Sequence, residues 1–199
     1  MKTIRRTTMA VVTISATILL ALPALATEWD LDTSHSSVAF EVRHMAISKV
    51  KGSFGDFSAT VTGDPGKPET FSVEATVQMT SVDTSNEKRD DHLRSADFFE
   101  VEKFPTMTFK STGVKMDGDK GKLMGELTLH GVTKPVEFEL EYAGMVDDPW
   151  GNTRMGFSAE AEIDRREFGL TWSKALETGG LVVDNDVEIE LEVELVQAK

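Results

Sequence analysis

Four histidines and paired acids such as Asp147-Asp148 are the side chains that could support acid–base or metal chemistry. The histidines lie far apart, at positions 35, 44, 92 and 130, and Asp147 and Asp148 fall in a turn-like stretch beside Pro149. The chain has no cysteine, no Gly-x-Ser-x-Gly nucleophile elbow and no His-Glu-x-x-His zinc motif. A metal site made from His44, His92 and nearby carboxylates is one alternative. We expect no catalytic residues, no metal and no cofactor, and we predict that the protein is not an enzyme.

A second group of residues has the chemistry to hold a polar or anionic head group. His44 continues the inward phase of a predicted strand, while Arg89 and His92 are three residues apart on a predicted helix. Arg166 and Lys174 lie in a long predicted loop. Each also has a structural interpretation, because a strand-end histidine can bond to backbone and helix cations can pair with neighbouring aspartates. We treat these five residues as head-group candidates.

The elements that must position these residues are mainly strands, because apolar and polar residues alternate with a period of two through most of the chain. Turn sequences rich in glycine, aspartate and proline separate the alternating segments. We predict an all-β antiparallel meander of about eight strands. The predicted strands are residues 38–43, 50–62 with a kink near Gly55, 71–79, 106–116, 121–130, 136–142, 155–163 and 187–195, with a short additional strand at 29–32.

Two segments depart from this pattern. Residues 84–99 lack alternation, and Thr84 and Glu87 have the spacing of a capping box, which predicts a helix that ends before Pro105. Residues 164–183 are too long for a tight hairpin, and long loops often carry function. Three apolar residues of this loop could either line a mouth of the barrel or plug it. They are Phe168, Leu170 and Trp172.

Strands that are each buried on one face must stack as a sandwich or close into a barrel, and the residue sizes favour the barrel. A barrel of eight strands is either filled by side chains or holds one small ligand. Methionines on inward phases would suit a variable tail, although ordinary core packing explains them as well. The predicted tail-binding residues are Val38, Phe40, Val42, Val77, Met79, Met107, Phe109, Leu127, Phe138, Leu140 and Phe157, together with Phe168, Leu170 and Trp172 in the long loop.

Alternate connections of an up-and-down meander lie at the same end. One end then holds segments 43–51, 81–104, 130–134 and 164–183, with 11 of the 18 lysines and arginines beyond residue 26 and only 10 acids. The remainder of the chain beyond residue 26 has 7 cations and 24 acids. We infer that a polar or anionic head would be tolerated at the first end only, unless the imbalance merely reflects glutamate-rich strand exteriors.

The N-terminal segment, residues 1–26, has the pattern of a secretory signal peptide. A cationic start at residues 2–6 precedes an uncharged stretch over 7–22 and a small-residue cleavage site that ends at Ala26. We expect residues 27–199 to form one exported domain. The net charge of −13 for the chain becomes about −16 for that domain, which argues against nucleic acid or an anionic membrane as a partner of the whole surface. No later stretch has the roughly 20 apolar residues of a membrane span, so we do not expect an integral membrane protein.

Several motifs together resemble the YceI-like family. They are SSVAFEVRHM at residues 36–45, VKGSF at 50–54, RDDHLRSADFF at 89–99 followed by Phe104-Pro105, and LTLHGVTKPV at 127–136. The resemblance extends over essentially the whole chain after residue 26. It implies a lipocalin-like antiparallel barrel, exported to the bacterial periplasm, that encloses a polyisoprenoid or another long amphiphile and has no catalytic site.

Two functions therefore compete. In the first, the protein is an exported carrier that holds a polyisoprenoid, an isoprenoid quinone or a fatty-acid-like amphiphile in its lumen, where each buried methylene contributes about 0.8 kcal/mol. In the second, the barrel is filled, and the protein is a stress-related structural or interaction protein without a ligand. Either form could be a homodimer. The presence or absence of an extractable lipid in purified protein distinguishes the two functions.

Overall fold

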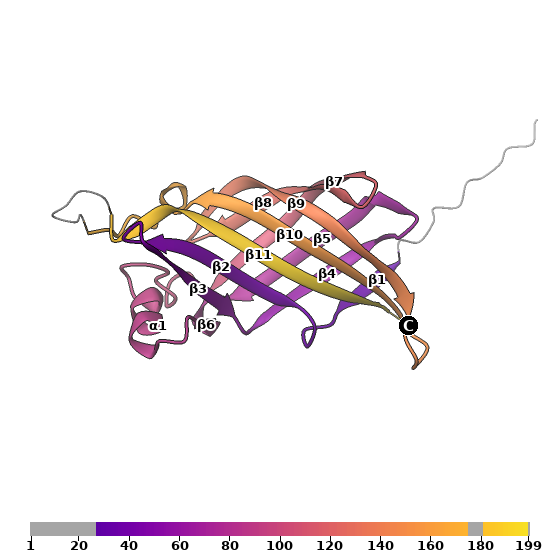
Figure 1. Ribbon diagram of the computed structural model, residues 1–199, viewed down its shortest axis with the longest axis horizontal. Helices are drawn as coiled ribbons and strands as arrows, with labels where there is room; N and C mark the ends of the chain where they lie inside the picture. Colours follow the sequence, from indigo (N-terminus) through magenta and orange to yellow (C-terminus); the bar gives the residue numbers. More distant parts are fainter. Residues whose placement is uncertain (1–26, 175–180, 199) are drawn as a thin grey trace, which may run out of the picture.

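The computed structural model of the chain describes residues 27–174 and 181–198, and the predicted signal peptide lies outside them. The described strands wrap around one axis, with α1 (Glu87–Arg94) at one end (Figure 1). Two short 3-10 helices are η1 (Met79–Ser81) and η2 (Arg165–Phe168). The strands are β1 (Glu28–Leu31), β2 (Ser37–His44), β3 (Ser48–Phe54), β4 (Phe57–Asp64), β5 (Lys67–Gln78), β6 (Val82–Asp83), β7 (Thr106–Asp117), β8 (Lys120–Leu129), β9 (Val132–Asp147), β10 (Thr153–Asp164) and β11 (Val183–Gln197).

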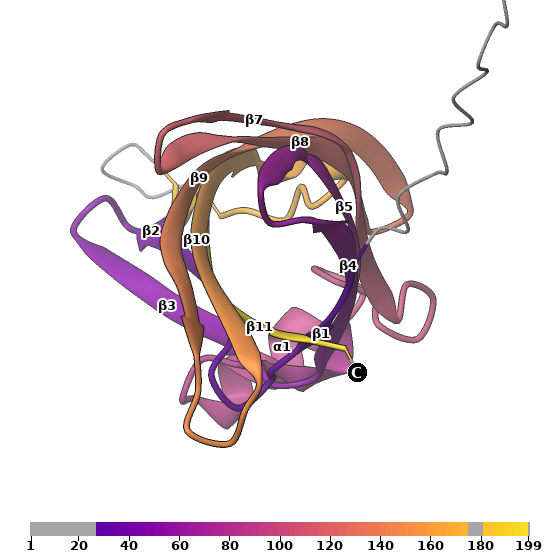
Figure 2. The same cartoon turned by 90° about the vertical axis from the view of Figure 1, so that its right-hand side faces the viewer.

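The strands close into an antiparallel barrel with eight positions in its wall. β1 and β2 share one position, because β1 pairs with β11 near Leu195 and β2 pairs with β11 near Leu191. β3 and β4 share the next position, since β3 pairs with β2 and β4 pairs with β1. The view along the axis shows the resulting ring of strands (Figure 2). The predicted all-β, eight-stranded antiparallel barrel with one short helix is confirmed.

Two interruptions bend the wall without opening it. Residues 55–56 separate β3 from β4, which confirms the predicted kink near Gly55. Between β1 and β2, the Ser36 hydroxyl replaces the missing backbone partner of β11. Its Oγ accepts a hydrogen bond from the Glu194 N–H at 2.9 Å and lies 3.5 Å from the Glu194 carbonyl. The side chain therefore keeps the first strand position attached to the last.

Helix α1 begins later than the sequence predicted. The prediction placed the helix start at Thr84, but Asn86 is the N-cap, and its side chain accepts a hydrogen bond from the Arg89 N–H. β6 pairs with β3 and holds the chain extended immediately before Thr84, so helical geometry cannot start there. Thr84 is buried instead, and both its N–H and its hydroxyl donate to Asp90 Oδ1.

The turn between β8 and β9 is shorter than predicted. Residues 130–135 have turn-like composition, yet only His130 and Gly131 connect the two strands. Their φ angles of 52° and 74° suit a tight two-residue hairpin turn. Pro135 lies within β9, opposite Glu126, rather than in the turn.

The two ends of the barrel differ in structure. The helix end carries α1, the β2–β3 turn, the β8–β9 turn and the β10–β11 connection, as the predicted meander requires (Figure 1). At the other end, which we call the tryptophan end, the side chain of Trp29 is 1% exposed. Its Nε1 donates a hydrogen bond to the Gly63 carbonyl at 3.3 Å, which ties β1 to the tip of the β4–β5 hairpin.

Candidate ligand-binding lumen

The barrel encloses two apolar chambers. Chamber 1, toward the tryptophan end, has a volume of about 160 Å³, and chamber 2, toward the helix end, about 90 Å³. Val38, Met107 and Ile189 line both chambers, so the two meet at these residues. Apolar cavities of about 150 Å³ stay dry and bind small apolar molecules. A substantial part of this lumen is therefore not filled by the barrel's own side chains.

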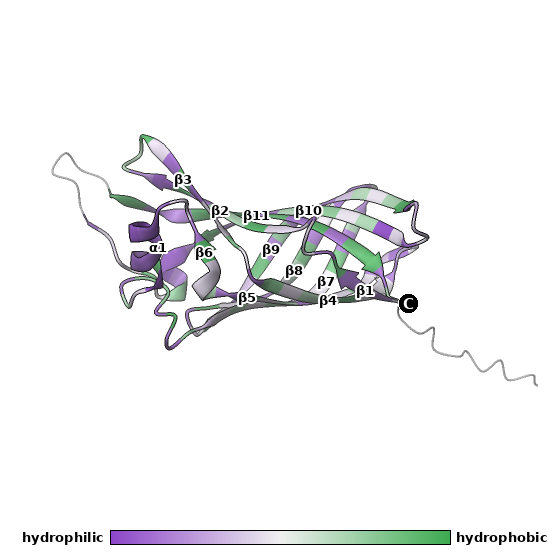
Figure 3. Ribbon diagram, turned by 90° about the horizontal axis from the view of Figure 1, so that it is seen from below, coloured by the Kyte–Doolittle hydropathy of each residue, from purple (hydrophilic) through white to green (hydrophobic). Residues whose placement is uncertain are grey.

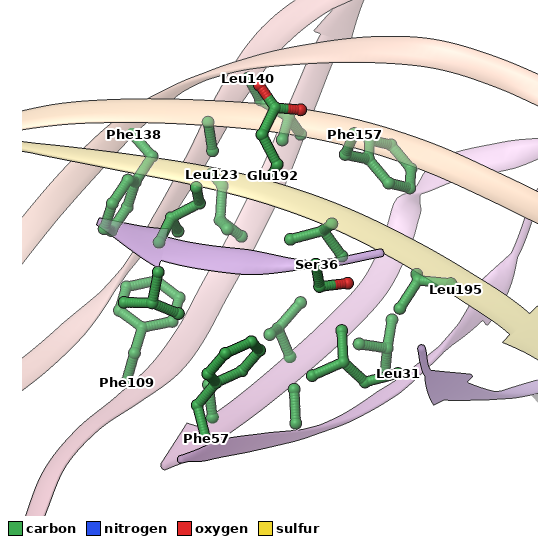
Figure 4. Close-up of a pocket in the computed structure, with 18 of the residues that line it drawn as sticks. Leu31, Ser36, Phe57, Phe109, Leu123, Phe138, Leu140, Phe157, Glu192 and Leu195 are labelled. Carbon is green, nitrogen blue, oxygen red and sulfur yellow. The ribbon is translucent and has the colours of Figure 1, made fainter. Parts of the chain in front are cut away.

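Most residues predicted to bind a tail line these chambers, because period-two alternation turns them inward. Figure 4 shows Phe109, Phe138, Leu140 and Phe157, from three strands, around chamber 1. The predicted residues that line chamber 1 are Val38, Val77, Met107, Phe109, Leu127, Phe138, Leu140 and Phe157, and those that line chamber 2 are Val38, Phe40, Val42, Met79, Met107 and Leu170.

Two predicted tail residues, Phe168 and Trp172, lie outside the chamber linings. Phe168 is 1% exposed in η2, and its carbonyl lies 3.2 Å from His130 Nδ1. Trp172 packs against His92 and Phe98, with ring centroids 5.0 Å apart in both pairs. Both residues hold segment 168–172 against the helix end, because Phe168 contacts the β8–β9 turn and Trp172 contacts α1.

Glycines let two aromatic rings lie flat against the wall. A Cβ added to Gly125 would come within 2.3 Å of Phe109 Cζ, and a Cβ added to Gly52 would come within 2.4 Å of Phe40 Cζ. Each ring thus occupies the place of a side chain on the neighbouring strand. Because the rings stay close to the wall, the centre of the lumen remains open.

Sequence reasoning missed the part of chamber 2 that the helix region supplies. Leu93 of α1, together with Phe98 and Phe99, lines this chamber. The segment has no period-two alternation, and Leu93 and the two adjacent phenylalanines are its few large apolar residues in a charged stretch. The Thr84–Asp90 hydrogen bonds hold α1 against the barrel, so the fold around the helix start decides this part of the wall.

Arg165 also lines chamber 2 and was not predicted as a site residue. It is 4% exposed, and its Nε donates to the Asp184 carbonyl at 2.7 Å. Nη1 donates to the carbonyls of Leu170 and Trp172 at 2.5 and 2.9 Å. Burial lowers the pKa of Arg165 from its usual value. The guanidinium thus fastens the β10–β11 connection to β11, and the lining of the chamber remains almost entirely apolar.

The five head-group candidates all lie at the helix end, but several already have partners. Arg89 donates from Nε to the Thr84 hydroxyl and from Nη2 to the Thr84 carbonyl, both at 2.7 Å. Arg166 pairs with Asp164, which holds the pKa of that carboxyl down at about 2. His92 lies 2.9 Å from Asp97. His44 is half-buried at the end of β2, and Lys174 is exposed.

A charged cluster at the tryptophan end surrounds Arg154. Its Nη1 donates to Asp32 at 2.7 Å and to Glu194, and its Nε donates to Asp148 at 2.8 Å. Hydrogen bonds from Arg154 hold the pKa values of Asp32 and Asp148 well below their usual range. Among the described residues, Asp32, His35 and Glu194 are the one group spaced to hold a metal ion, and it does not include His44 or His92. Because the guanidinium already neutralises two of its acids, the cluster is best explained as a link between strands.

The arrangement of strands and chambers agrees with the motifs found in the sequence. The model of the YceI-like domain matches residues 29–195. The chain belongs to the YceI-like family. A curated relative, "Protein YceI" of Salmonella newport (strain SL254), is 42% identical over 178 residues, which cover 88% of this chain and 90% of the relative. The same identity and coverage hold for "Protein YceI" of Salmonella agona (strain SL483).

Solved structures of three other proteins have the same architecture. The Campylobacter jejuni YCEI protein is 35% identical with a TM-score of 0.70, and the match covers 85% of this chain and 97% of that one. BcnA of Burkholderia cenocepacia is 25% identical with a TM-score of 0.73, over 83% of this chain and 99% of that one. A polyisoprenoid binding domain from Saccharophagus degradans is 16% identical with a TM-score of 0.60, over 88% and 100%, and shares the fold. Within the described residues, no helix is long and apolar enough to cross a membrane.

Proposed function

We propose that this YceI-like protein is an exported carrier that encloses a long-chain amphiphile in its lumen. The observation that supports this function best is the pair of connected apolar chambers. Two chambers that meet at Val38, Met107 and Ile189 suit an extended hydrocarbon chain better than a compact polar molecule. The ligand classes that fit are a polyisoprenoid, an isoprenoid quinone and a fatty-acid-like amphiphile.

The energetics of the lumen favour an occupied barrel over a structural one. Cavities cost about 24 cal/mol per Å³, so leaving chamber 1 empty costs on the order of 4 kcal/mol. A tail that fills the chamber recovers this free energy and adds about 0.8 kcal/mol for each buried methylene. A protein with only a structural role gains nothing from maintaining such a space. The alternative of a filled barrel without a ligand is therefore less favoured.

The head group of the ligand belongs at the helix end. Both chambers have almost entirely apolar linings, which leave a polar head without hydrogen-bond partners inside the lumen. Arg89 and Arg166 already bind Thr84 and Asp164, so His44 and Lys174 are the head-group candidates that we favour. The polyisoprenoid binding domain that shares this fold supports a ligand with an isoprenoid tail.

Lipid extraction tests the carrier function directly. Protein purified without detergent from an expressing bacterium is extracted with organic solvent, and the extract is analysed by mass spectrometry. We expect a polyprenyl or long acyl compound in near-stoichiometric amount. A lipid-free extract from native, folded protein would favour the structural function instead.

We also propose that the signal peptide is removed and that the mature protein is periplasmic. The cationic start, the uncharged stretch and Ala26 at the cleavage point support this location. Intact-mass analysis of the periplasmic fraction should give a chain that begins at Thr27. A mass that still includes Met1 would contradict this proposal.

A further inference from the structure

The tip of the β2–β3 hairpin exposes apolar side chains. Ile47 is 81% exposed and Met45 is 36% exposed, and the hairpin projects from the barrel wall at the helix end (Figures 2 and 3). We infer that this tip, with the cationic residues beside it, docks on an anionic lipid bilayer. The inference goes beyond the carrier function and does not depend on which ligand the lumen holds.

The turn at the tip has a strained backbone, and its sequence is not one that stabilises such a turn. Met45 and Ala46 have φ angles of 53° and 59°, and the Ile47 N–H donates to the His44 carbonyl at 3.2 Å. Two consecutive positive φ angles favour Asn-Gly and are strained for other residues. Since a turn optimised for stability would not carry Met-Ala, the apolar residues point to a role outside folding.

The charge next to the tip is also unfavourable within the hairpin. Arg43 lies directly opposite Lys49 in the β2–β3 ladder, and like charges in that position destabilise a strand pair. Lys49 pairs with Glu41 and Glu188, and Lys51 also pairs with Glu41, whereas Arg43 makes no ion pair with any carboxylate of residues 27–174 and 181–198. Residues 43–51 contain three cations and no acid. An anionic surface would attract both cations and so offset their mutual repulsion.

Charge also favours a bilayer contact through the β2–β3 tip over a contact through the β9–β10 tip at the opposite end. The β9–β10 hairpin at the tryptophan end exposes Trp150 (78%) and Val146 (64%), a comparable apolar pair. That tip carries Asp147 and Asp148, and the single guanidinium of Arg154 is shared among Asp148, Asp32 and Glu194. This end therefore stays net negative, and an anionic bilayer repels it. A protein that is strongly acidic overall would approach such a bilayer with the β2–β3 tip first.

Docking of this tip would bring one end of the lumen to the lipid surface. Val42, three residues before Met45, lines chamber 2, and so does Val183, which pairs with His44 at the base of the tip. Two apolar side chains and a few cations give a weak, reversible contact that depends on salt. Such a contact suits a protein that exchanges an amphiphile with a membrane and then leaves it.

The test is vesicle flotation with protein purified from the periplasm of an expressing bacterium, with the same N-terminus in every variant. Vesicles contain either phosphatidylcholine alone or equal parts phosphatidylcholine and phosphatidylglycerol. We expect binding only to the anionic vesicles, and loss of that binding at high salt. Arg43→Gln should weaken binding about fivefold, as expected for one cation near an anionic surface.

The decisive variant is Met45→Asn with Ala46→Gly, which places a favoured turn sequence at the tip. It should raise the melting temperature while it weakens vesicle binding, a combination that misfolding cannot produce. Ile47→Ser should also weaken binding. The matched control, Val146→Ser with Trp150→Ser, should bind as the parent does. Equal binding by the parent and the Asn-Gly variant, loss of binding in the control, or no binding by the parent would each overturn the inference.

Discussion

The ring of Phe109 lies over Gly125 on the neighbouring strand, so closely that a Cβ on Gly125 would come within 2.3 Å of Phe109 Cζ. Replacement Gly125→Ala must therefore push the ring off the wall and into chamber 1, and it must also shift the backbone, because the added Cβ would lie 2.6 Å from the Lys110 carbonyl oxygen. We expect a loss of about 1–3 kcal/mol in the free energy of unfolding, measured by urea denaturation, together with less bound lipid. Gly113→Ala is the control, because its nearest neighbour, Met124 Cε, lies 3.6 Å from the added Cβ. Similar losses in both variants would show that the ring is not the cause.

The buried hydrogen bonds between Thr84 and Asp90 hold α1 against the barrel. Asp90→Ala leaves the Thr84 N–H and hydroxyl without this acceptor, and each unsatisfied buried group costs about 1–3 kcal/mol. We expect a lower melting temperature and faster amide exchange across α1. Hydrogen–deuterium exchange measures the second quantity. Asp91→Ala, on the exposed side of the same helix, should change both quantities little. Unchanged exchange in Asp90→Ala would contradict the anchoring role.

Arg154 makes stability depend on pH in the acid range. It lowers the pKa values of Asp32 and Asp148, so the stability that these acids contribute is present above the ordinary aspartate pKa of about 3.9 and is lost as the pH falls below it. Arg154→Met should be less stable than the parent at neutral pH, and the difference should shrink in acid. Urea denaturation across this pH range measures the effect. Arg166→Gln, which removes an exposed partner of Asp164, should cause little change.

Adding bulk to chamber 1 separates a hollow barrel from a filled one. Leu140→Phe places a larger side chain in the chamber lining, so bound lipid should decrease while the stability of the lipid-free protein stays nearly unchanged. In a filled core the same change would cost about 1–3 kcal/mol by overpacking. Phe40→Trp tests this less well, because the Phe40 ring already lies against Gly52. Lipid content by mass spectrometry and urea denaturation must be measured on the same preparation.

The barrel could be predicted because the sequence of each strand shows which of its faces is apolar and therefore points inward. Alternation such as that of Ile189, Leu191 and Val193 with glutamates fixes which side chains point inward, and a meander of such strands has few ways to bury all of them. The helix start could not be predicted from Thr84 and Glu87. The pairing of β6 with β3, a contact between distant segments, holds the chain extended at that point.

The sequence by itself determined the family, the eight-stranded barrel and most of the inward-facing residues, because these depend on local patterns and on motifs that lie close together. Only the tertiary structure decided which inward residues border empty space. That space depends on where the Phe109 ring lies relative to Gly125, and on how Arg165 and Thr84 fasten the β10–β11 connection and α1 at the helix end. Phe168 and Trp172 show the same limit, since their apolar character indicates burial but not the surface that buries them. Packing between segments far apart in the chain leaves no periodic pattern in the sequence, whereas a half-buried strand leaves a period-two alternation.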